Sequence, residues 1–322
     1  AEGLMITSSG VTLKDFAVED TIGDAIVVKG AKGINFLRVR TEWTGGPKAS
    51  NGAYGFYPVQ STDVLIDDCV AIGASDAGIY VGQSERIKVL NSVARYNVAG
   101  IEIENSFYAE VIGNTSEHNT GGILIFDLPD LPQQGGHDIL VANNIVRNND
   151  TDNFAPEGNI VGNTPNGTGI MVMANQFVEI RDNQIKNNAT AGILIASYQD
   201  EAEDKNYNPI ASNIFIHGNF LKNNGFDVDT IRAKPISDVI DGKAPDIIWD
   251  GVVPLIEWIG LKSSKRIILG DNYTDSNSSI FVNLKLMTKF LTPPLHKVDT
   301  NYENYRGQLK PIRPVVFEKG LN

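Results

Sequence analysis

The sequence lacks features that several common kinds of protein require. Its 322 residues include one cysteine, Cys69, which argues against an internal disulfide and a cysteine-based zinc site. Lys and Arg number 27 against 39 Asp and Glu, so the formal net charge is −12. No basic cluster is visible, and we therefore expect no nucleic-acid partner. No apolar run reaches the roughly 18 residues of a membrane span, so none is expected.

Glycine and asparagine, in contrast, are abundant. The chain has 31 glycines, and asparagines often occur in pairs such as Asn143-Asn144 and Asn187-Asn188. Both residue types accept positive φ and favour turns. This composition predicts a chain with many turns and little helix.

A short motif, a small residue followed by apolar–any–apolar, recurs along the chain. Its copies begin at residues 3, 25, 55, 78, 100, 122, 169 and 192, with spacings of 22, 30, 23, 22, 22, 47 and 23. A second apolar segment lies about nine residues after each copy, and a third short one ends in an asparagine. Three strands and three turns in about 22 residues are typical of one coil of a parallel β-helix.

The same register predicts how far the solenoid extends. Continuing it places first strands at 258–261 and 279–282, which gives about ten coils in one domain over residues 1–285. Asparagines after the second and third strands should form columns between coils. Residues 286–322 leave the repeat, and we expect them to pack along the outside or to cap the end. The chain starts at the first coil, with Ala rather than Met and no signal peptide, so we expect preceding residues that carry a cap or further coils.

Insertions into the repeat point to one face of the solenoid. They fall before or after the first strand of a coil, at residues 41–54, 127–138, 150–168, 197–213 and 225–257. We expect these loops to wall a groove whose floor is the outward side of the first strands.

Alternation along the strands predicts two zones on this floor. One zone combines aromatic and acidic side chains, a mixture suited to sugars: Tyr57, Asp76, Tyr80, Glu102 and Glu104. The other zone is apolar and should need a cover, from the long insertion or the tail, or a protein partner: Leu124, Phe126, Met171, Met173 and Leu194.

Two kinds of sugar chemistry fit these candidates. Glu102 and Glu104 are two residues apart on one strand, roughly 7 Å by strand rise, which lies in the range of inverting glycosidases. Tyr57, Tyr80 and the loop residue His137 could instead serve a uronate lyase or C5-epimerase, together with Arg95, which is expected on a different strand. The structural alternatives are a solvated strand face for the glutamates and an aromatic stack between coils for the tyrosines.

Oxygen-rich loop segments raise the possibility of a calcium site. Asp150 and Asp152 lie in the run Asn149–Asn153, and hard cations prefer such ligands. The segment matches no EF-hand or glycine-rich calcium repeat, and a plain solvated loop is the alternative.

Several segments are distinctive enough to suggest a family. Residues 41–61, 74–84, 96–105 and 119–124, which include Gly55-Phe56-Tyr57-Pro58 and Gly78-Ile79-Tyr80-Val81, resemble an exported, largely uncharacterised bacterial family of right-handed parallel β-helix repeat proteins. This resemblance implies a right-handed β-helix and a periplasmic or extracellular location. More distantly, the coils look like the carbohydrate-binding and sugar-hydrolase β-helix superfamily, which includes mannuronan C5-epimerases and alginate lyases. The epimerase motif Asp-Pro-His-Asp is absent, and its nearest counterpart, Tyr57-Pro58-Val59-Gln60, lacks both acids and the histidine.

These observations favour an all-β, exported protein that binds a polysaccharide or oligosaccharide, and they leave open whether it also acts on it as a lyase, epimerase or hydrolase. Two alternatives stay open: a non-catalytic cell-envelope scaffold that uses the apolar zone for a protein partner, and a metal-binding periplasmic β-helix. An acidic chain fits a neutral glycan, or a bridging calcium ion, better than an anionic polymer.

Overall fold

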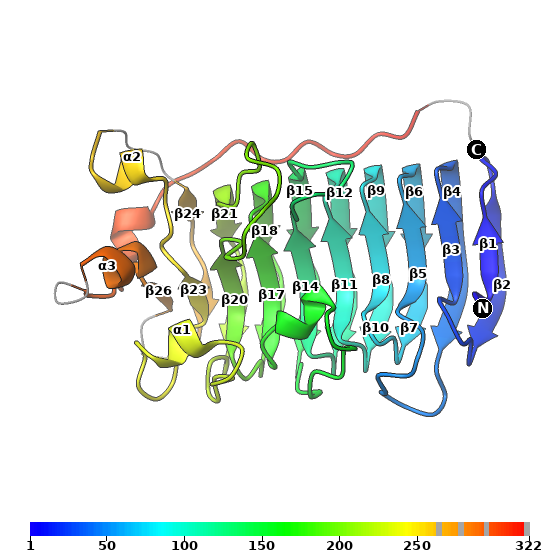
Figure 1. The fold of residues 1–322 in the computed structure, drawn as a ribbon, viewed down its shortest axis with the longest axis horizontal. Helices are drawn as coiled ribbons and strands as arrows, with labels where there is room; N and C mark the ends of the chain where they lie inside the picture. The colour runs from blue at the N-terminus through cyan, green and yellow to red at the C-terminus, as the bar shows by residue number, and fades with distance from the viewer. Residues whose placement is uncertain (262–265, 276–279, 293–295, 319–322) are drawn as a thin grey trace.

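The computed structural model describes residues 1–261, 266–275, 280–292 and 296–318, and in it the chain winds into a parallel β-helix (Figure 1). The first strands of successive coils form a 10-stranded parallel sheet. In order they are β1 (Leu4–Ile6), β3 (Ile26–Lys29), β5 (Tyr54–Val59), β8 (Ala77–Gly82), β11 (Ala99–Glu104), β14 (Gly121–Phe126), β17 (Thr168–Met173), β20 (Ala191–Ala196), β23 (Ile247–Trp249) and β26 (Phe281–Asn283). The predicted fold is therefore confirmed.

The second and third strands share one 16-stranded sheet, because the long strand β4 (Lys32–Glu42) pairs with β6 in its first half and with β7 in its second. The remaining second strands are β6 (Thr62–Asp67), β9 (Glu85–Leu90), β12 (Phe107–Ile112), β15 (His137–Ala142), β18 (Gln176–Arg181), β21 (Ser212–His217) and β24 (Ile267–Leu269), and β2 (Thr12–Glu19) pairs with β4. The third strands are β7 (Val70–Ile72), β10 (Val93–Arg95), β13 (Thr115–Glu117), β16 (Ile145–Arg147), β19 (Gln184–Lys186), β22 (Phe220–Lys222) and β25 (Tyr273–Thr274).

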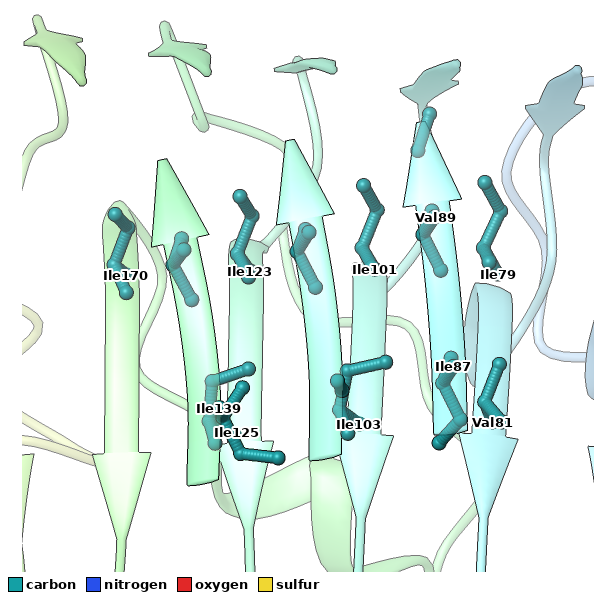
Figure 2. Packing of buried hydrophobic residues seen from close by; sticks show 14 of the residues in the cluster. Ile79, Val81, Ile87, Val89, Ile101, Ile103, Ile123, Ile125, Ile139 and Ile170 are labelled. Carbon is teal, nitrogen blue, oxygen red and sulfur yellow. The ribbon is translucent and has the colours of Figure 1, made fainter. Parts of the chain in front are cut away.

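The core consists of columns of β-branched side chains between the sheets. Ile79, Ile101, Ile123 and Ile170 occupy the same register position on four successive first strands, and each is fully buried. Figure 2 shows them facing Ile87, Val89 and Ile139 from the second strands. The alternation of strand side chains thus places one apolar residue inside and leaves the next one on the outer face.

Asparagine columns close two of the turns. Asn119 accepts hydrogen bonds from the backbone and side-chain nitrogens of Asn97, and its own amide donates to Ala94 O and to Asn149 Oδ1. The column continues through Asn188 and Asn224 and ends on Asp246. Because these groups are buried, each amide satisfies backbone polar atoms that no water can reach.

Removing one amide from this column should therefore be costly. We expect Asn119→Gly to lower the free energy of unfolding by about 2 kcal/mol, because two backbone groups of the preceding coil, Asn97 N–H and Ala94 C=O, lose this partner. Asn187→Gly is the matched control: Asn187 belongs to an exposed amide column and has a φ of 56°, which glycine tolerates. Urea unfolding measures both, and equal losses would contradict the buried-column explanation.

The last coils differ from the sequence prediction. Residues 258–261 were expected to form a first strand, but α2 (Leu255–Trp258) and a turn occupy this segment, and the ninth first strand is β23 instead. The expected insertion 225–257 therefore contains a strand as well as α1 (Lys234–Ser237). The expected strand at 279–282 corresponds to β26, although Ser279 lies outside the described residues.

The chain after β26 turns back along the solenoid. It forms α3 (Leu286–Leu291) and a 3-10 turn (Tyr302–Tyr305), and then runs in an extended conformation over the 16-stranded sheet toward the N-terminal coil (Figure 1). The backbone N–H groups of Ile312, Val315 and Glu318 donate to the carboxylates of Glu179, Glu110 and Asp63.

This tail has a period that matches the solenoid. The three acceptor carboxylates lie on β18, β12 and β6, which are two coils apart. Three extended residues advance about 10 Å, and two coils advance about the same distance. Each third residue of the tail can therefore reach the next carboxylate.

Candidate functional site

Three tyrosines cluster on the outer face of the first-strand sheet. The rings of Tyr54 and Tyr57 stack with centroids 4.3 Å apart, and both contact Tyr80, at 4.8 Å and 5.1 Å. Tyr57 and Tyr80 meet because β5 and β8 are neighbouring strands in register. Tyr80 is buried, whereas Tyr54 and Tyr57 are partly exposed. Tyr57 and Tyr80 therefore contact each other between coils, as the structural alternative for these tyrosines required, but with their rings tilted by 60°, and Tyr54 is an additional member of the cluster.

Three carboxyl groups lie beside the tyrosines. The Tyr80 hydroxyl donates to Glu104 Oε1 at 2.6 Å, and the Tyr54 hydroxyl lies 3.4 Å from Asp76 Oδ2. Glu102, the register neighbour of Tyr80, is 1% exposed, and its Oε2 has no hydrogen-bond partner among the described residues. We call these six residues the acid–tyrosine cluster: Tyr54, Tyr57, Asp76, Tyr80, Glu102 and Glu104.

Burial makes these carboxyl groups weak acids. Burial and then the charge of Glu104 raise the pKa of Asp76 to about 7. Burial likewise raises the pKa of Glu104 to about 7, against the hydrogen bond from Tyr80. The pKa of Glu102 is raised well above its usual range by burial and by both neighbouring charges. At neutral pH the cluster therefore holds both protonated and ionised carboxyl groups.

A glycine makes the contact between Tyr80 and Glu104 possible. Glu104 pairs with Gly82 on β8, and a Cβ atom at Gly82 would collide with the Tyr80 hydroxyl. The Tyr80 ring thus lies over the space that a side chain at position 82 would occupy, and from there it reaches the next coil.

This geometry predicts the effect of two substitutions on a measurable pKa. Gly82→Ala should push Tyr80 away from Glu104, and Tyr80→Phe should remove the hydroxyl directly. Because the Tyr80 hydrogen bond lowers the pKa of Glu104, both variants should raise that pKa, by roughly one unit. Carboxyl-carbon NMR titration measures it, and an unchanged or lowered pKa in Tyr80→Phe would rule out this role of the hydroxyl.

The insertion loop that follows β16 reaches the cluster. Asn159 donates from Nδ2 to Asp76 Oδ2 at 2.9 Å, just before a 3-10 turn (Ile160–Asn163). Asn159 also lines a polar hollow of about 410 Å³ together with Asn163, Asp200 and Arg232. One loop therefore contacts both a carboxyl group of the cluster and the neighbouring hollow.

A second, largely apolar cavity begins one coil further along. It has a volume of about 580 Å³, and its floor is formed by Phe126, Met171, Met173, Leu194 and Ala196. Phe126 is the register neighbour of Glu104, so the cavity adjoins the acid–tyrosine cluster. Its walls come from residues 160–165, 197–200 and 231–236, and Leu284 and Leu286 also line it. Insertions on both sides of the first strands thus line this face, and the 225–257 segment covers part of the apolar zone.

The structure does not bring His137 to the cluster. Sequence reasoning placed it on a flanking loop, but it is the first residue of β15 in the 16-stranded sheet. Its ring stacks on Phe107 at 4.6 Å, and its Nδ1 lies 2.6 Å from Asp138 Oδ2. The loop ends two residues earlier than expected, at residue 136 rather than 138, because the strand register is already established at His137.

The two candidate calcium ligands have separate partners. Asp150 Oδ1 lies 2.9 Å from His118 Nδ1, whereas Asp152 Oδ1 accepts from the amide of Asn166 at 3.2 Å. In the described ranges, no group of three or more His, Cys, Asp or Glu residues is arranged to hold a metal ion.

Tyr54 and Asn159 were not among the sequence candidates. Tyr54 was assigned to the end of the 41–54 insertion, although it is the first residue of β5 and pairs with Ala77. If the predicted strand had begun one residue earlier, at Tyr54, this residue would have been expected beside Asp76. Asn159 lies in an insertion that has no repeat register, and nothing in the sequence indicates its partner.

Comparison with known proteins supports the fold. Residues 24–206 match the family model described as the right handed beta helix region, which covers more than half of the chain, and the protein belongs to this family. No curated protein sequence matches the chain. In the part of the chain that the structure describes, no helix is long and apolar enough to cross a membrane.

Several solved structures have a similar chain trace at low identity. The A-module of mannuronan C-5 epimerase AlgE4 from Azotobacter vinelandii has a TM-score of 0.41 at 16% identity, covering 84% of this chain and 74% of that one. The AlgE6 A-module from the same organism gives 0.46 at 18%, with 83% and 69% covered. For the periplasmic alginate epimerase AlgG the values are 0.42 and 12%, with 80% and 59% covered.

Proposed function

We propose that this protein binds a neutral glycan at the acid–tyrosine cluster and hydrolyses it there. The observation that carries the proposal is the group of three buried carboxyl groups beside three tyrosine rings, with no Lys, Arg or His among the partners described for those carboxyl groups. Tyrosine rings offer a flat surface to the C–H face of a sugar. Tyr54 and Tyr57 are the partly exposed members, so the sugar enters over their rings.

The electrostatics favour hydrolysis over uronate chemistry. A lyase or epimerase must neutralise the carboxylate of a uronate before it can remove the neighbouring proton, and three acidic groups would repel that substrate. Hydrolysis needs a carboxylic acid that donates its proton to the glycosidic oxygen. It also needs a carboxylate that takes a proton from the water that bonds to the anomeric carbon. Asp76 and Glu104, each with a pKa of about 7, supply one proton donor and one proton acceptor near neutral pH.

Further parts of the proposal rest on the sequence resemblance, which implies an exported, periplasmic or extracellular protein. A calcium ion bound near Asp150 and Asp152 remains a secondary proposal, and loss of stability on chelation would support it.

The test compares neutral and uronic oligosaccharides of matched length by titration calorimetry and by release of reducing ends. We expect saturable binding and hydrolysis of at least one neutral glycan. Glu104→Gln should abolish hydrolysis and retain binding, because the amide has the same shape but exchanges no proton. Failure of every glycan to bind would overturn the proposal and would favour the scaffold alternative. Tighter binding of the uronic series would overturn it in favour of an anionic glycan as the ligand.

A further inference from the structure

The outer face of the first-strand sheet changes character within one coil. Tyr80, Glu102, Leu124, Met171 and Leu194 occupy one register column on β8, β11, β14, β17 and β20. The column is hydroxyl- and carboxyl-bearing as far as β11 and apolar from β14 onward. Neighbouring strands are about 4.8 Å apart, so this boundary is narrower than a sugar ring with one substituent.

The cavity beyond the boundary is built for an apolar group. Its floor residues carry no charge, and the buried Asp250 on its wall is already satisfied by the backbone and hydroxyl of Ser197 and by Val252 N. Two isoleucines at its edge are unusually exposed, Ile160 at 40% and Ile231 at 81%. They come from two different insertions and line the same cavity. A volume of about 580 Å³ is within the usual range for small-molecule sites.

We propose that this cavity binds an apolar substituent, such as an alkyl or acyl chain, on the glycan that the acid–tyrosine cluster recognises. The substrate class is therefore a neutral glycolipid-like amphiphile, with its sugar at the tyrosines and its chain along β14, β17 and β20. This inference rests on the proposed function for the sugar, whereas the chain site rests on the cavity alone. The adjacent polar hollow shares Ile160, Gly162, Asn163, Asp200 and Arg232 with the cavity, so the polar and apolar spaces adjoin.

Methionine methyl groups can report locally on binding of the ligand's alkyl chain. The protein has four: Met171 and Met173 lie on the cavity floor, Met287 lies in α3 next to the lining residue Leu286, and Met5 lies on β1 at the opposite end of the solenoid. With ¹³C-methyl-labelled methionine, titration with methyl, butyl and octyl β-glucoside should shift the Met171 and Met173 signals in proportion to chain length. The Met5 signal should not move. The octyl compound should bind about tenfold or more tightly than the methyl compound, because each buried methylene adds to affinity.

Two variants test the site without touching the cluster. Ala196→Phe fills the floor, and Met173→Gln makes it polar at similar length; both should remove the dependence on chain length and leave binding of the free oligosaccharide unchanged. Ala17→Phe, the same substitution on the exposed strand β2, is the control. The cavity proposal is wrong if the alkyl chain length has no effect on binding to the wild type. It is also wrong if that effect persists in both cavity variants.

The outcomes separate the two proposals. If free glycans bind and the alkyl chain length of the glucosides has no effect on affinity, the proposed function stands and the chain site is wrong. Octyl glucoside that shifts Met171 and Met173 while no free glycan binds leaves the chain site intact and removes the glycan function.

Discussion

Replacing Val315 by aspartate should lower the free energy of unfolding by about 4 kcal/mol, the largest loss that we expect from one surface-segment residue. Val315 is 5% exposed, and its backbone N–H donates to Glu110 Oε1 at 3.0 Å. Glu110 is itself 7% exposed and is paired with Lys88 at 3.4 Å. An aspartate at position 315 would place a second negative charge beside the buried Glu110 carboxylate, which forms its ion pair with Lys88.

The neighbouring valine provides the control. Val316 is 75% exposed, so Val316→Asp makes the same change one residue away and should alter stability by less than about 0.5 kcal/mol. Urea unfolding followed by circular dichroism gives both values. Limited proteolysis should cleave the tail faster in the Val315 variant alone. Equal effects of the two substitutions would mean that the tail is not held at the Glu110 position.

The acceptor positions of this tail could not have been found from the sequence. Glu110 and Glu179 occupy the same register position two coils apart, and Asp63 lies two residues before the corresponding position on β6. All three are irregularly spaced along the chain, because insertions of different length separate their coils. The prolines of the segment predict an extended conformation, but its partners depend on two-coil spacing, which only the assembled solenoid provides.

The coils themselves were predictable because each satisfies the same local rule. Ile79, Ile101 and Ile123 recur every 22 residues, and one register fixes both the core and the outward column. The prediction was wrong for residues 258–261, where an apolar–any–apolar pattern occurs in α2 and its turn. The true strand β23 follows Asp246, which takes the place of an asparagine at the end of the buried column. Because an aspartate replaces the asparagine at this position, the coil that contains β23 could not be recognised from the asparagine pattern.

Proximity within the acid–tyrosine cluster follows from the same register. Tyr57, Tyr80 and Glu102 are on adjacent strands and face outward, so their approach was predictable. Their burial was not, because it depends on how the insertions fold over them. The contact of Asn159 with Asp76 joins residues 83 positions apart, one of them in a loop without repeat register.

That burial has a consequence for stability that can be measured at Glu102. Its pKa in the folded protein lies well above the ordinary value of 4.5. As pH rises above 4.5, the unfolded chain loses this proton and the folded chain keeps it. The folded state then binds more protons than the unfolded state, so the free energy of unfolding falls with pH. The contribution is fully present below pH 4.5 and is lost progressively above it.

Glu102→Gln should remove this loss. The amide has the same shape and does not titrate. Its nitrogen, however, would occupy a buried position like that of Glu102 Oε2, which has no hydrogen-bond partner among the described residues. We therefore expect the variant to be slightly less stable than the wild type at pH 4. Its stability relative to the wild type should then improve as the pH rises from 4.5 to 8, by about 1.4 kcal/mol for each pH unit over which the folded protein keeps a proton that the unfolded chain has lost.

The decisive quantity is the slope of the free energy of unfolding against pH, because it depends on the proton of Glu102 and not on a change in packing. Chemical unfolding of both proteins at half-unit intervals from pH 4 to pH 8 measures it. Glu201→Gln, at an exposed position, should follow the wild-type curve throughout. Since Asp76 and Glu104 also have raised pKa values, the Glu102 variant should keep a smaller decline of its own between about pH 4 and pH 7. Parallel curves for wild type and Glu102→Gln would show that Glu102 ionises normally. The cluster would then be open to water, and a mixture of protonated and ionised carboxyl groups at neutral pH would lose its physical basis.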